Sequence, residues 1–331
     1  MINFTKRPVE VIATLALLVL LVVAPMLGSR QLMYNLTLVA IFACPVIGLN
    51  LLLGLAGQVS FAQVAFMAIG GYGSALMTTR LGIDPWAAMG LSALLAIFVA
   101  VIVGLPLFRL KAHYFAMSTY ALGMGTFSFA TAADWLTNGS IGISGIPPLV
   151  LGSLSLGNPW RFYFLAWIVC VLFLLIVAIL ANSHIGRAWR ALAAGPEIAS
   201  ALGVNLVRYK LLAFVIAAFM ATVAGSLYVE FTSFVGPDLY DIKSQISIFL
   251  MLFIGGPQSL IGPVIGSMIF TFVPQWIAST EQLQNLIFYV FLLVLLLVRP
   301  AGILGDTPIY QNLLRGSTKQ VRHSEGSTRA V

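Results

Sequence analysis

Eight apolar stretches of this chain contain no Asp, Glu, Lys or Arg, and no other feature restricts the fold as strongly. They cover residues 11–29, 31–79, 85–108, 112–133, 162–186, 211–229, 244–280 and 282–298. A helix needs about 20 mainly apolar residues to cross a bilayer. Only 8% of the residues are charged, against about 25% in soluble domains. We therefore expect an all-α membrane protein, because helices satisfy their own backbone hydrogen bonds in lipid.

Two of these stretches are too long for a single crossing, and each contains a cluster that should interrupt a helix. The stretch 31–79 contains Gly54-Leu55-Ala56-Gly57-Gln58, and the stretch 244–280 contains Gly255-Gly256-Pro257-Gln258-Ser259. Each stretch is expected to form either two crossings or one crossing and a re-entrant piece. The chain should then be a polytopic bundle of about 8–10 transmembrane segments with interrupted helices.

The N-terminal stretch has two interpretations. Lys6-Arg7 followed by the apolar run Val11–Ala24 has the form of a signal peptide. No good small-x-small cleavage site follows, since the chain reads Ala24-Pro25-Met26-Leu27, so we favour a first span that is retained. Residues 1–305 are then expected to form the membrane domain. The polar, basic residues 306–331 are expected to form a disordered cytoplasmic tail.

The distribution of lysine and arginine predicts the orientation, because cytoplasmic loops carry an excess of both residues. With ten crossings and the N-terminus inside, the inner loops would hold all of them except Arg30, Arg80, Arg161 and Lys243. The outer loops would hold the acidic residues Asp84, Asp134, Asp238, Asp241 and Glu281. Both termini are therefore predicted to be cytoplasmic. The net charge of +7 reflects this topology and does not indicate nucleic-acid binding.

Residues 183–208 interrupt the apolar pattern with a short charged segment. Gly195-Pro196 should end one helix and begin another, because proline suits the first helical position. Glu197 would lie in the first turn, where the helix dipole favours a carboxylate, and Gly203 would close the helix in the left-handed conformation. One face would carry Ile198, Ala201 and Leu202. So short a helix is unstable alone, so it either lies on its own bundle or enters the groove of a partner protein.

The two helix-interrupting clusters lead into similar glycine-spaced segments, GQVSFAQVAFMAIGGYGSA (57–75) and GGPQSLIGPVIGSMIF (255–270). Inverted-repeat transporters show such a pattern, with the interrupted segments near the translocation path. The alternative is ordinary helix packing with a tight turn. The candidate path residues are Gly57, Gln58, Ser60, Gln63, Tyr72, Gln258 and Ser259. Their polar groups either meet a passing solute or form hydrogen bonds with neighbouring helices.

Several motifs of enzymes and carriers are absent from the sequence. There is no H-E-x-x-H motif or cysteine–histidine cluster, so no metal site is expected, and Cys44 and Cys170 lie in apolar runs as packing residues. There is no G-x-x-x-x-G-K-[ST] motif, so we do not expect an enzyme that hydrolyses ATP itself. His113, His184 and Glu230 lie near predicted helix ends, which disfavours an ion-coupled carrier with buried acids. An active transporter would need a partner as its energy source.

Five motifs in order carry a resemblance to a known family. They are GLNLLLGLAGQVSFAQVAFMAIGGY (48–72), RLKAHYFAMSTYALG (109–123), NGSIGISGIP (138–147), NSHIGRAWRALAAGPEIASALGVNLVRYKLLAF (182–214) and IGGPQSLIGPVIGS (254–267). Their order and spacing over about residues 40–305 resemble the branched-chain amino-acid permeases of ABC importers, of the larger, M type. The segment GMGTFSFATAAD departs from the polar or charged patch usual in that family, which bears on the substrate.

The resemblance implies partners and contacts. Residues Glu197–Gly203 are similar to the E-A-A-x-x-x-G coupling helix that seats in the ATPase subunit, with Ile198 in the second place. The implied coupling residues are Arg187, Arg190, Glu197, Ile198, Ala199, Ala201, Leu202 and Gly203. The implied partners are two cytoplasmic ABC ATPases, a second and related permease, and a periplasmic solute-binding protein, in a bacterial inner membrane. ATP would be used by the partner subunits, and this chain would bind no cofactor.

The resemblance implies a branched-chain or other hydrophobic amino acid as substrate. Relatives that handle urea or small aromatic and short-chain acids provide the alternative. An ion-coupled carrier or facilitator is a reading of a different class, as is a membrane enzyme such as a lipid transferase. A carrier would work without ATP, and a lipid transferase would need polar residues clustered at one membrane interface.

Overall fold

The computed structural model describes residues 30–110, 112–151, 154–277 and 302–304; the predicted segments 11–29, 282–298 and 306–331 lie outside them. The longer helices are α2 (Arg30–Asn50), α3 (Gln63–Thr79), α4 (Pro85–Leu107), α5 (Ala112–Ala132), α7 (Pro159–Asn182), α8 (His184–Ala194), α10 (Leu206–Thr232), α11 (Ile242–Gly255) and α12 (Gly262–Ile277). The short ones are η3 (Leu51–Leu55), α6 (Asp134–Thr137), η4 (Gly139–Ile141), α9 (Pro196–Ala201) and η5 (Pro237–Tyr240). Strand β1 (Ile143–Ser144) pairs with β4 (Phe234–Val235), and β2 (Val150–Leu151) pairs with β3 (Leu154–Ser155). The prediction of an all-α bundle is confirmed.

Four described segments are long and apolar enough to cross a membrane: Arg30–Leu55, α4, α7 and α10. Their starting points follow from local chemistry. The Asp84 carboxylate accepts from the Trp86 N–H at 3.0 Å, and Pro85 takes the first position of α4. The Asn158 side chain and Pro159 do the same for α7. Such caps satisfy amide groups that have no partner within the helix.

Both predicted interruptions are present. The first long stretch forms α2, a π-helical turn at η3, a connector at residues 56–62 and then α3. The second forms α11 and α12, separated by a turn at residues 256–261. Gly57 and Gly256 have positive φ angles of 65° and 98°, a backbone conformation that glycine adopts without steric cost. Each long stretch therefore folds as two helices.

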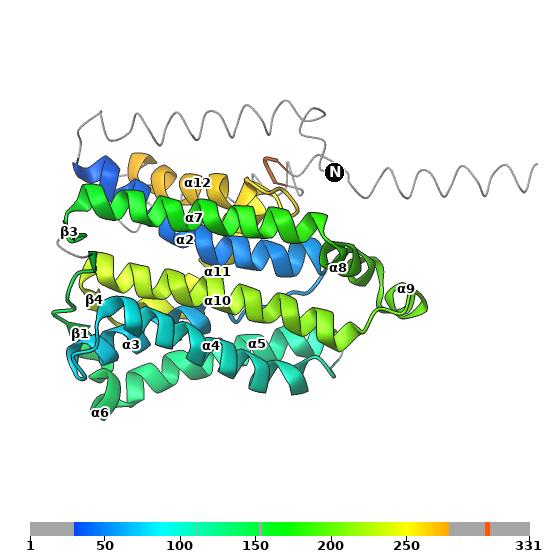
Figure 1. Cartoon of the computed structure of the whole chain (residues 1–331), viewed down its shortest axis with the longest axis horizontal. Helices are drawn as coiled ribbons and strands as arrows, with labels where there is room; N and C mark the ends of the chain where they lie inside the picture. Colours follow the sequence, from blue (N-terminus) through cyan, green and yellow to red (C-terminus); the bar gives the residue numbers. More distant parts are fainter. Residues whose placement is uncertain (1–29, 111, 152–153, 278–301, 305–331) are drawn as a thin grey trace, which may run out of the picture.

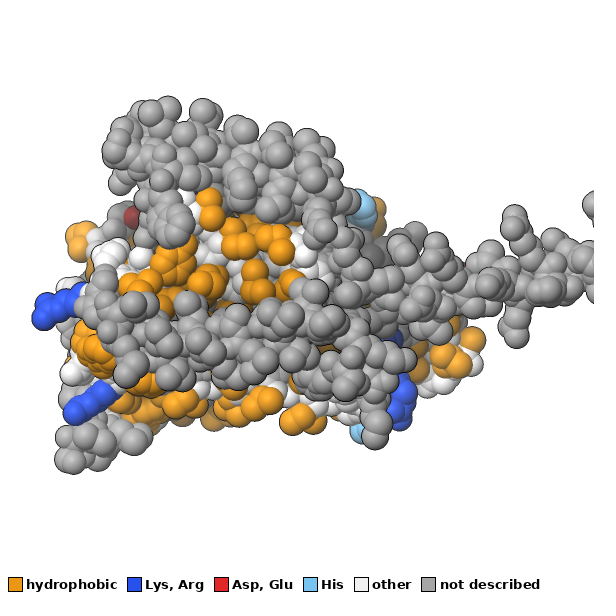
Figure 2. Space-filling model, turned by 90° about the horizontal axis from the view of Figure 1, so that it is seen from above, with side chains coloured by type: hydrophobic (Ala, Val, Ile, Leu, Met, Phe, Trp, Pro, Cys, Tyr) orange, Lys and Arg blue, Asp and Glu red, His pale blue; other side chains and the backbone are white. Residues whose placement is uncertain are grey.

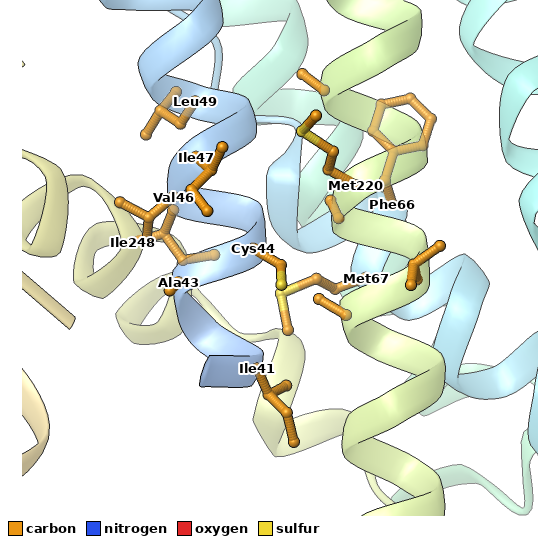
Figure 3. Close-up of a cluster of buried hydrophobic side chains, with 14 of the residues drawn as sticks. Ile41, Ala43, Cys44, Val46, Ile47, Leu49, Phe66, Met67, Met220 and Ile248 are labelled. Carbon is orange, nitrogen blue, oxygen red and sulfur yellow. The ribbon is translucent and has the colours of Figure 1, made fainter. Parts of the chain in front are cut away.

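The centre of the bundle lies where α2, α3 and α10 meet, with α11 and α12 on the other side of α2. Figure 3 shows Cys44 of α2 directed toward Met67 of α3, while Val46 lies beside Ile248 of α11. Cys44 and Cys170 are both free and fully buried, which confirms them as packing residues. Beyond its exposed first two residues and Tyr34, most of α2 is therefore buried, in agreement with its mainly apolar sequence.

Helices α3 and α10 cross at very short range because glycines on each face the backbone of the other. A Cβ atom at Gly70 would lie 2.0 Å from the Thr222 carbonyl oxygen, and one at Gly225 would lie 2.0 Å from the Met67 carbonyl oxygen. Hydrogen bonds tie the crossing together, since the Ser226 hydroxyl donates to the Gly70 carbonyl at 3.1 Å. Small residues and hydroxyl groups are the usual means of packing helices in membranes.

The molecule has two chemically distinct ends. Figure 1 shows α8 and α9 at one end, which we call the α8–α9 end, and β1, β4 and α6 at the other, which we call the β1–β4 end. The cations Arg80 and Arg161 lie at the β1–β4 end, and Arg187 and Arg208 lie at the α8–α9 end. In Figure 2 the visible blue side chains lie at the two ends, and orange ones cover the visible part between them. This separation agrees with the sequence-based grouping of Lys and Arg.

The outward faces of α4 and α7 are apolar along the bundle. Only 33% of the apolar window of each is buried within the bundle. Their exposed large side chains are Leu91, Leu94, Leu95, Phe98, Ile102 and Leu105 on α4, and Trp160, Phe164, Ile168, Leu172, Leu175 and Ile179 on α7. Apart from Trp160 at the first turn of α7, these are aliphatic side chains and phenylalanines. Faces of this composition suit contact with lipid chains.

Candidate functional site

Helices α8 and α9 form an arm at one end of the bundle, and its local structure follows from the sequence. The Ser183 hydroxyl caps α8 by accepting from the Ile185 N–H at 3.1 Å. Along α8, the residues Gly186, Ala188, Trp189 and Leu192 are buried. The Trp189 indole is fully buried, and its Nε1–H donates to the Tyr209 carbonyl at 2.8 Å. This buried tryptophan anchors the arm to the start of α10.

The predicted short helix is present as α9. Pro196 takes its first position, Glu197 lies in its first turn, and Gly203 follows it with a φ angle of 74°. Ala199 is fully buried and its carbonyl accepts from the Val204 N–H at 2.9 Å. Three local predictions for this segment are therefore confirmed: Pro196 begins the helix, Glu197 lies in its first turn, and Gly203 follows its end in the left-handed conformation.

The outer face of α9 is apolar and points away from the bundle. Ile198 is 52% exposed and Leu202 is 69% exposed, and Ala201 beside them is exposed too. Ala199 packs inward against the protein's own bundle, while Ile198 and Leu202 project outward; entry into the groove of a partner stays a prediction. An apolar tip on a polar arm is suited to insertion into a protein groove.

The two arginines before α9 differ in their surroundings. Arg187 is exposed, so its guanidinium is available to a partner. Arg190 is partly buried, and its Nη1–H donates to the Ala181 carbonyl at 2.8 Å. That carbonyl belongs to the last turn of α7, where the helix dipole favours a cation. Arg190 therefore helps to hold α8 against α7.

The predicted path residues of the first interruption are mostly buried. The Gln58 side chain donates to the Ala56 and Gly57 carbonyls at 3.3 and 3.2 Å, and the Ser60 hydroxyl accepts from the Ala62 N–H at 3.3 Å. These hydrogen bonds stay within the connector and shape its turn. The Gln63 and Tyr72 side chains are buried as well. Gln63 Oε1 and the Tyr72 hydroxyl have no hydrogen-bond partner among the described residues.

At the second interruption, Gln258 and Ser259 form the turn itself. Gln258 is exposed and has a φ angle of 76°, unusual for a residue with a side chain. Ser259 is buried, and its hydroxyl accepts from the Gly262 N–H at 3.2 Å at the start of α12. The path role of these residues stays a prediction, while their part in the turn is clear.

Asn50, which sequence reasoning missed, joins the two interruptions. Its side chain is buried at the end of α2; Oδ1 accepts from the Gln258 N–H at 2.9 Å, and Nδ2 donates to the Ser259 carbonyl at 2.8 Å. One amide group thus satisfies a donor and an acceptor some 209 residues away. An asparagine between apolar residues directly before a helix break was the available signal.

Asn50→Leu is expected to destabilise the bundle and to impair activity, because it leaves the buried Ser259 carbonyl and the partly buried Gln258 N–H without partners. Each unsatisfied group costs about 1–3 kcal/mol. The measurement is the unfolding temperature of the purified protein. Thr37→Val is the matched control, since Thr37 is buried in the same helix and its hydroxyl donates to the Met33 carbonyl of that helix. Equal unfolding temperatures for the two variants would contradict the role of Asn50.

The connector between η3 and α3 is held on two further sides. The Phe61 N–H donates to the Thr119 hydroxyl of α5 at 3.1 Å, and the Phe61 carbonyl accepts from the Gln245 side chain of α11. The Phe61 ring stacks on Phe249 with centroids 4.2 Å apart. A Cβ atom at Gly57 would lie 2.9 Å from the Ala193 Cα of α8. The connector therefore touches the α8–α9 arm directly.

One buried acid corrects the sequence-based expectation. Glu230 was placed at the edge of a span, and no buried acids were expected. In the structure its side chain is 4% exposed near the end of α10, and neither carboxyl oxygen has a hydrogen-bond partner among the described residues. The expectation was wrong because α10 extends to Thr232, so that Glu230 lies within the helix and under the packing of its neighbours.

Comparisons with known proteins agree with the resemblance. Residues 31–299 match the family model described as the permease component of branched-chain amino acid transport systems. The chain is 27% identical to the high-affinity branched-chain amino acid transport permease LivM of Escherichia coli strain K12, over 92% of this chain and 77% of that protein.

Two other relatives widen the comparison. The chain is 30% identical to the permease LivH of Salmonella typhimurium, over 83% of this chain and 95% of that protein. It is 24% identical to a probable LivM permease of Methanocaldococcus jannaschii, over 67% and 68% of the two chains. No solved structure matches.

Proposed function

The chain belongs to the permease family of branched-chain amino acid transport systems, and on that premise we propose that it is the M-type membrane subunit of an ATP-driven importer for hydrophobic amino acids. The single observation that supports this most is the α8–α9 arm. It presents Ile198 and Leu202 on a short capped helix, at one end of a bundle whose middle is apolar. A transport subunit without a phosphate-binding motif of its own needs a surface that binds an ATPase, so that conformational changes of the ATPase can drive transport.

The arm would act as the coupling element. Ile198 and Leu202 would enter a groove of a cytoplasmic ATPase subunit, with Arg187 and Glu197 as exposed polar contacts beside them. The buried Trp189 and the Arg190–Ala181 hydrogen bond make the arm stiff at its base. A movement of the bound ATPase would then displace α9 and α8 together. Ala193 of α8 would press against Gly57 of the connector.

The orientation follows from the same assignment. The α8–α9 end would face the cytoplasm and the β1–β4 end the periplasm of the bacterial inner membrane, with both chain termini inside. Arg109, Arg187, Arg190, Arg208 and Lys210 then lie on the cytoplasmic side, as the excess of basic residues in inner loops requires. The periplasmic end would receive the solute from a binding protein.

A second permease would complete the assembly. Relatives of two kinds, LivM and LivH, match this chain over 92% and 83% of its length. The fuller coverage by LivM supports the M-type position for this chain, and a related H-type permease would be its partner. Two ATPase subunits and a periplasmic binding protein would complete the importer.

The test is purification in mild detergent from the native host, followed by uptake in proteoliposomes with the associated binding protein. We expect two ATPases and a second permease to copurify, and radiolabelled leucine or valine to accumulate only with ATP. Accumulation of urea or benzoate and not of leucine would place the solute in another class. Uptake driven by a proton gradient without ATP would overturn the importer assignment.

A further inference from the structure

Helix α5 occupies the predicted apolar stretch 112–133 and has the length of a membrane span, but it is less apolar than the described spans. It contains 21 residues, yet it is absent from the described helices that are apolar enough to cross a membrane. Its exposed residues include His113, Tyr114, Met117, Tyr120, Ala121, Gly125, Ser128 and Phe129. The exposed faces of α4 and α7 carry mostly leucine, isoleucine and phenylalanine instead. The exposed face of α5 is therefore less uniformly apolar than the faces of α4 and α7 that suit lipid contact.

A cavity of about 470 Å³ lies between this face and the connector. Its lining consists of Gly57, Val59 and Phe61 of the connector and His113, Ala116, Met117 and Tyr120 of α5. The volume falls within the range of about 300–1,000 Å³ that is typical of small-molecule sites. The described lining is mainly apolar and aromatic, with His113 as its one titratable side chain other than the Tyr120 phenol.

The connector that forms one wall is non-helical backbone within a membrane segment. Such backbone is tolerated at membrane depth only where protein covers it or where it lines a water-filled cavity. Its end next to α3 is covered, because Phe61 bonds to Thr119 and Gln245. Its middle is open, because Val59 is 39% exposed and Gly57 is exposed as well. The open part faces the cavity.

We propose that this cavity is a solute-binding section of the translocation passage and that it holds the apolar side chain of the transported amino acid. Phe61, Met117 and Tyr120 would form its apolar wall, and the exposed face of α5 would continue the passage toward the β1–β4 end. The second permease would close the open side. This inference rests on the proposed transport function. It places the solute beside Gly57, a candidate path residue, and beside Phe61, Met117 and Tyr120, which the sequence did not select.

The contact between Gly57 and Ala193 gives the passage a link to the arm. Since a Cβ atom at Gly57 would lie 2.9 Å from the Ala193 Cα, any movement of α8 toward the bundle displaces the connector. The connector is one wall of the cavity, so its displacement changes the width of the passage. An apolar wall without charges holds the solute weakly, which allows release at each cycle.

The test uses matched cysteine variants in the reconstituted complex. Met117→Cys is placed in the cavity, and Leu94→Cys is its control on α4, because the native side chains are 64% and 63% exposed. The native Cys44 and Cys170 are both 0% exposed, so they give little background. A charged, water-soluble methanethiosulfonate is applied to both membrane sides, and ATP-driven leucine uptake of each variant is compared before and after labelling.

We expect Met117→Cys to be labelled at least about tenfold faster than Leu94→Cys, because the reactive thiolate forms only in contact with water. Labelling should block uptake by Met117→Cys, leave uptake by Leu94→Cys unchanged, and be slowed by an excess of leucine. If Met117→Cys does not assemble, Tyr120→Cys takes its place, with Leu212→Cys as control; the native residues are 38% and 37% exposed.

Equal labelling of the cavity variant and its control would show that lipid covers α5 and would overturn the proposal. Fast labelling that leaves uptake intact would also overturn it, since the cavity would then be a water-filled crevice outside the passage. Absence of ATP-driven leucine uptake in the wild-type complex is a separate result, and it would count against the proposed transport function itself.

Discussion

Leu202→Asp is expected to abolish ATP-driven uptake while the protein still reaches the membrane in normal amount. Leu202 is 69% exposed at the tip of the arm, beside Ile198 at 52%, so a carboxylate there disturbs no packing in the bundle. When α9 is bound in the groove of an ATPase, the same carboxylate would be buried without a hydrogen-bond partner. Loss of an anchor in such a seat commonly costs about 2 kcal/mol or more, a factor of about 30 in affinity.

The measurement is leucine uptake together with recovery of the ATPase on purification. The control is Leu81→Asp, because Leu81 is also 69% exposed but lies in the turn after α3 at the β1–β4 end. Glu197→Lys and Gly203→Asp should resemble Leu202→Asp, since both change the charge of the same exposed tip. Normal uptake with Leu202→Asp would exclude the arm as the coupling element.

Gly225→Val is expected to prevent folding of the bundle. A Cβ atom at Gly225 would lie 2.0 Å from the Met67 carbonyl oxygen and 2.9 Å from the Met67 Cα, so α3 and α10 would have to separate. Separation would break the hydrogen bonds from Ser226 to Gly70 and from Thr222 to Phe66. Overpacking of a core usually costs about 1–3 kcal/mol, and a clash with fixed backbone should exceed that range.

The yield and the monodispersity of the purified protein measure this effect. Gly90→Val in α4 is the control, because a Cβ atom at Gly90 would meet no atom within 4 Å. We expect normal yield from Gly90→Val and aggregated or degraded protein from Gly225→Val. A monodisperse Gly225→Val protein with normal uptake would mean that the α3–α10 crossing adapts more readily than its geometry indicates.

Local features of the sequence predicted the parts of the fold that depend on neighbouring residues. The helix breaks at Gly54–Gln58 and Gly255–Ser259, the start of α9 at Pro196 and its left-handed end at Gly203 all follow from residue types within a few positions. Four of the predicted apolar stretches coincide with described helices that are long and apolar enough to cross a membrane, because only long apolar helices are stable in lipid.

The candidate path residues illustrate what residue type alone cannot decide. Gln58 and Ser60 were selected as polar groups in a membrane segment, but their hydrogen bonds shape the connector itself. The candidate Gly57 lines the cavity beside them, together with Phe61, Met117 and Tyr120, which are ordinary apolar and aromatic residues in the sequence. Polarity indicates which groups need partners, and it does not indicate which surfaces remain open.

The sequence alone determined that this chain is a helical membrane protein, where its helices break, and that it carries a short capped arm. Only the tertiary structure decided that Asn50 joins the two breaks, that Gly57 touches the arm at Ala193, that Glu230 is buried, and that α5 turns a weakly apolar face outward. The physical reason is the sequence separation over which each interaction acts. Caps, breaks and hydropathy act between residues a few positions apart, whereas these contacts join segments far apart in the chain and depend on how closely glycine-bearing helices approach.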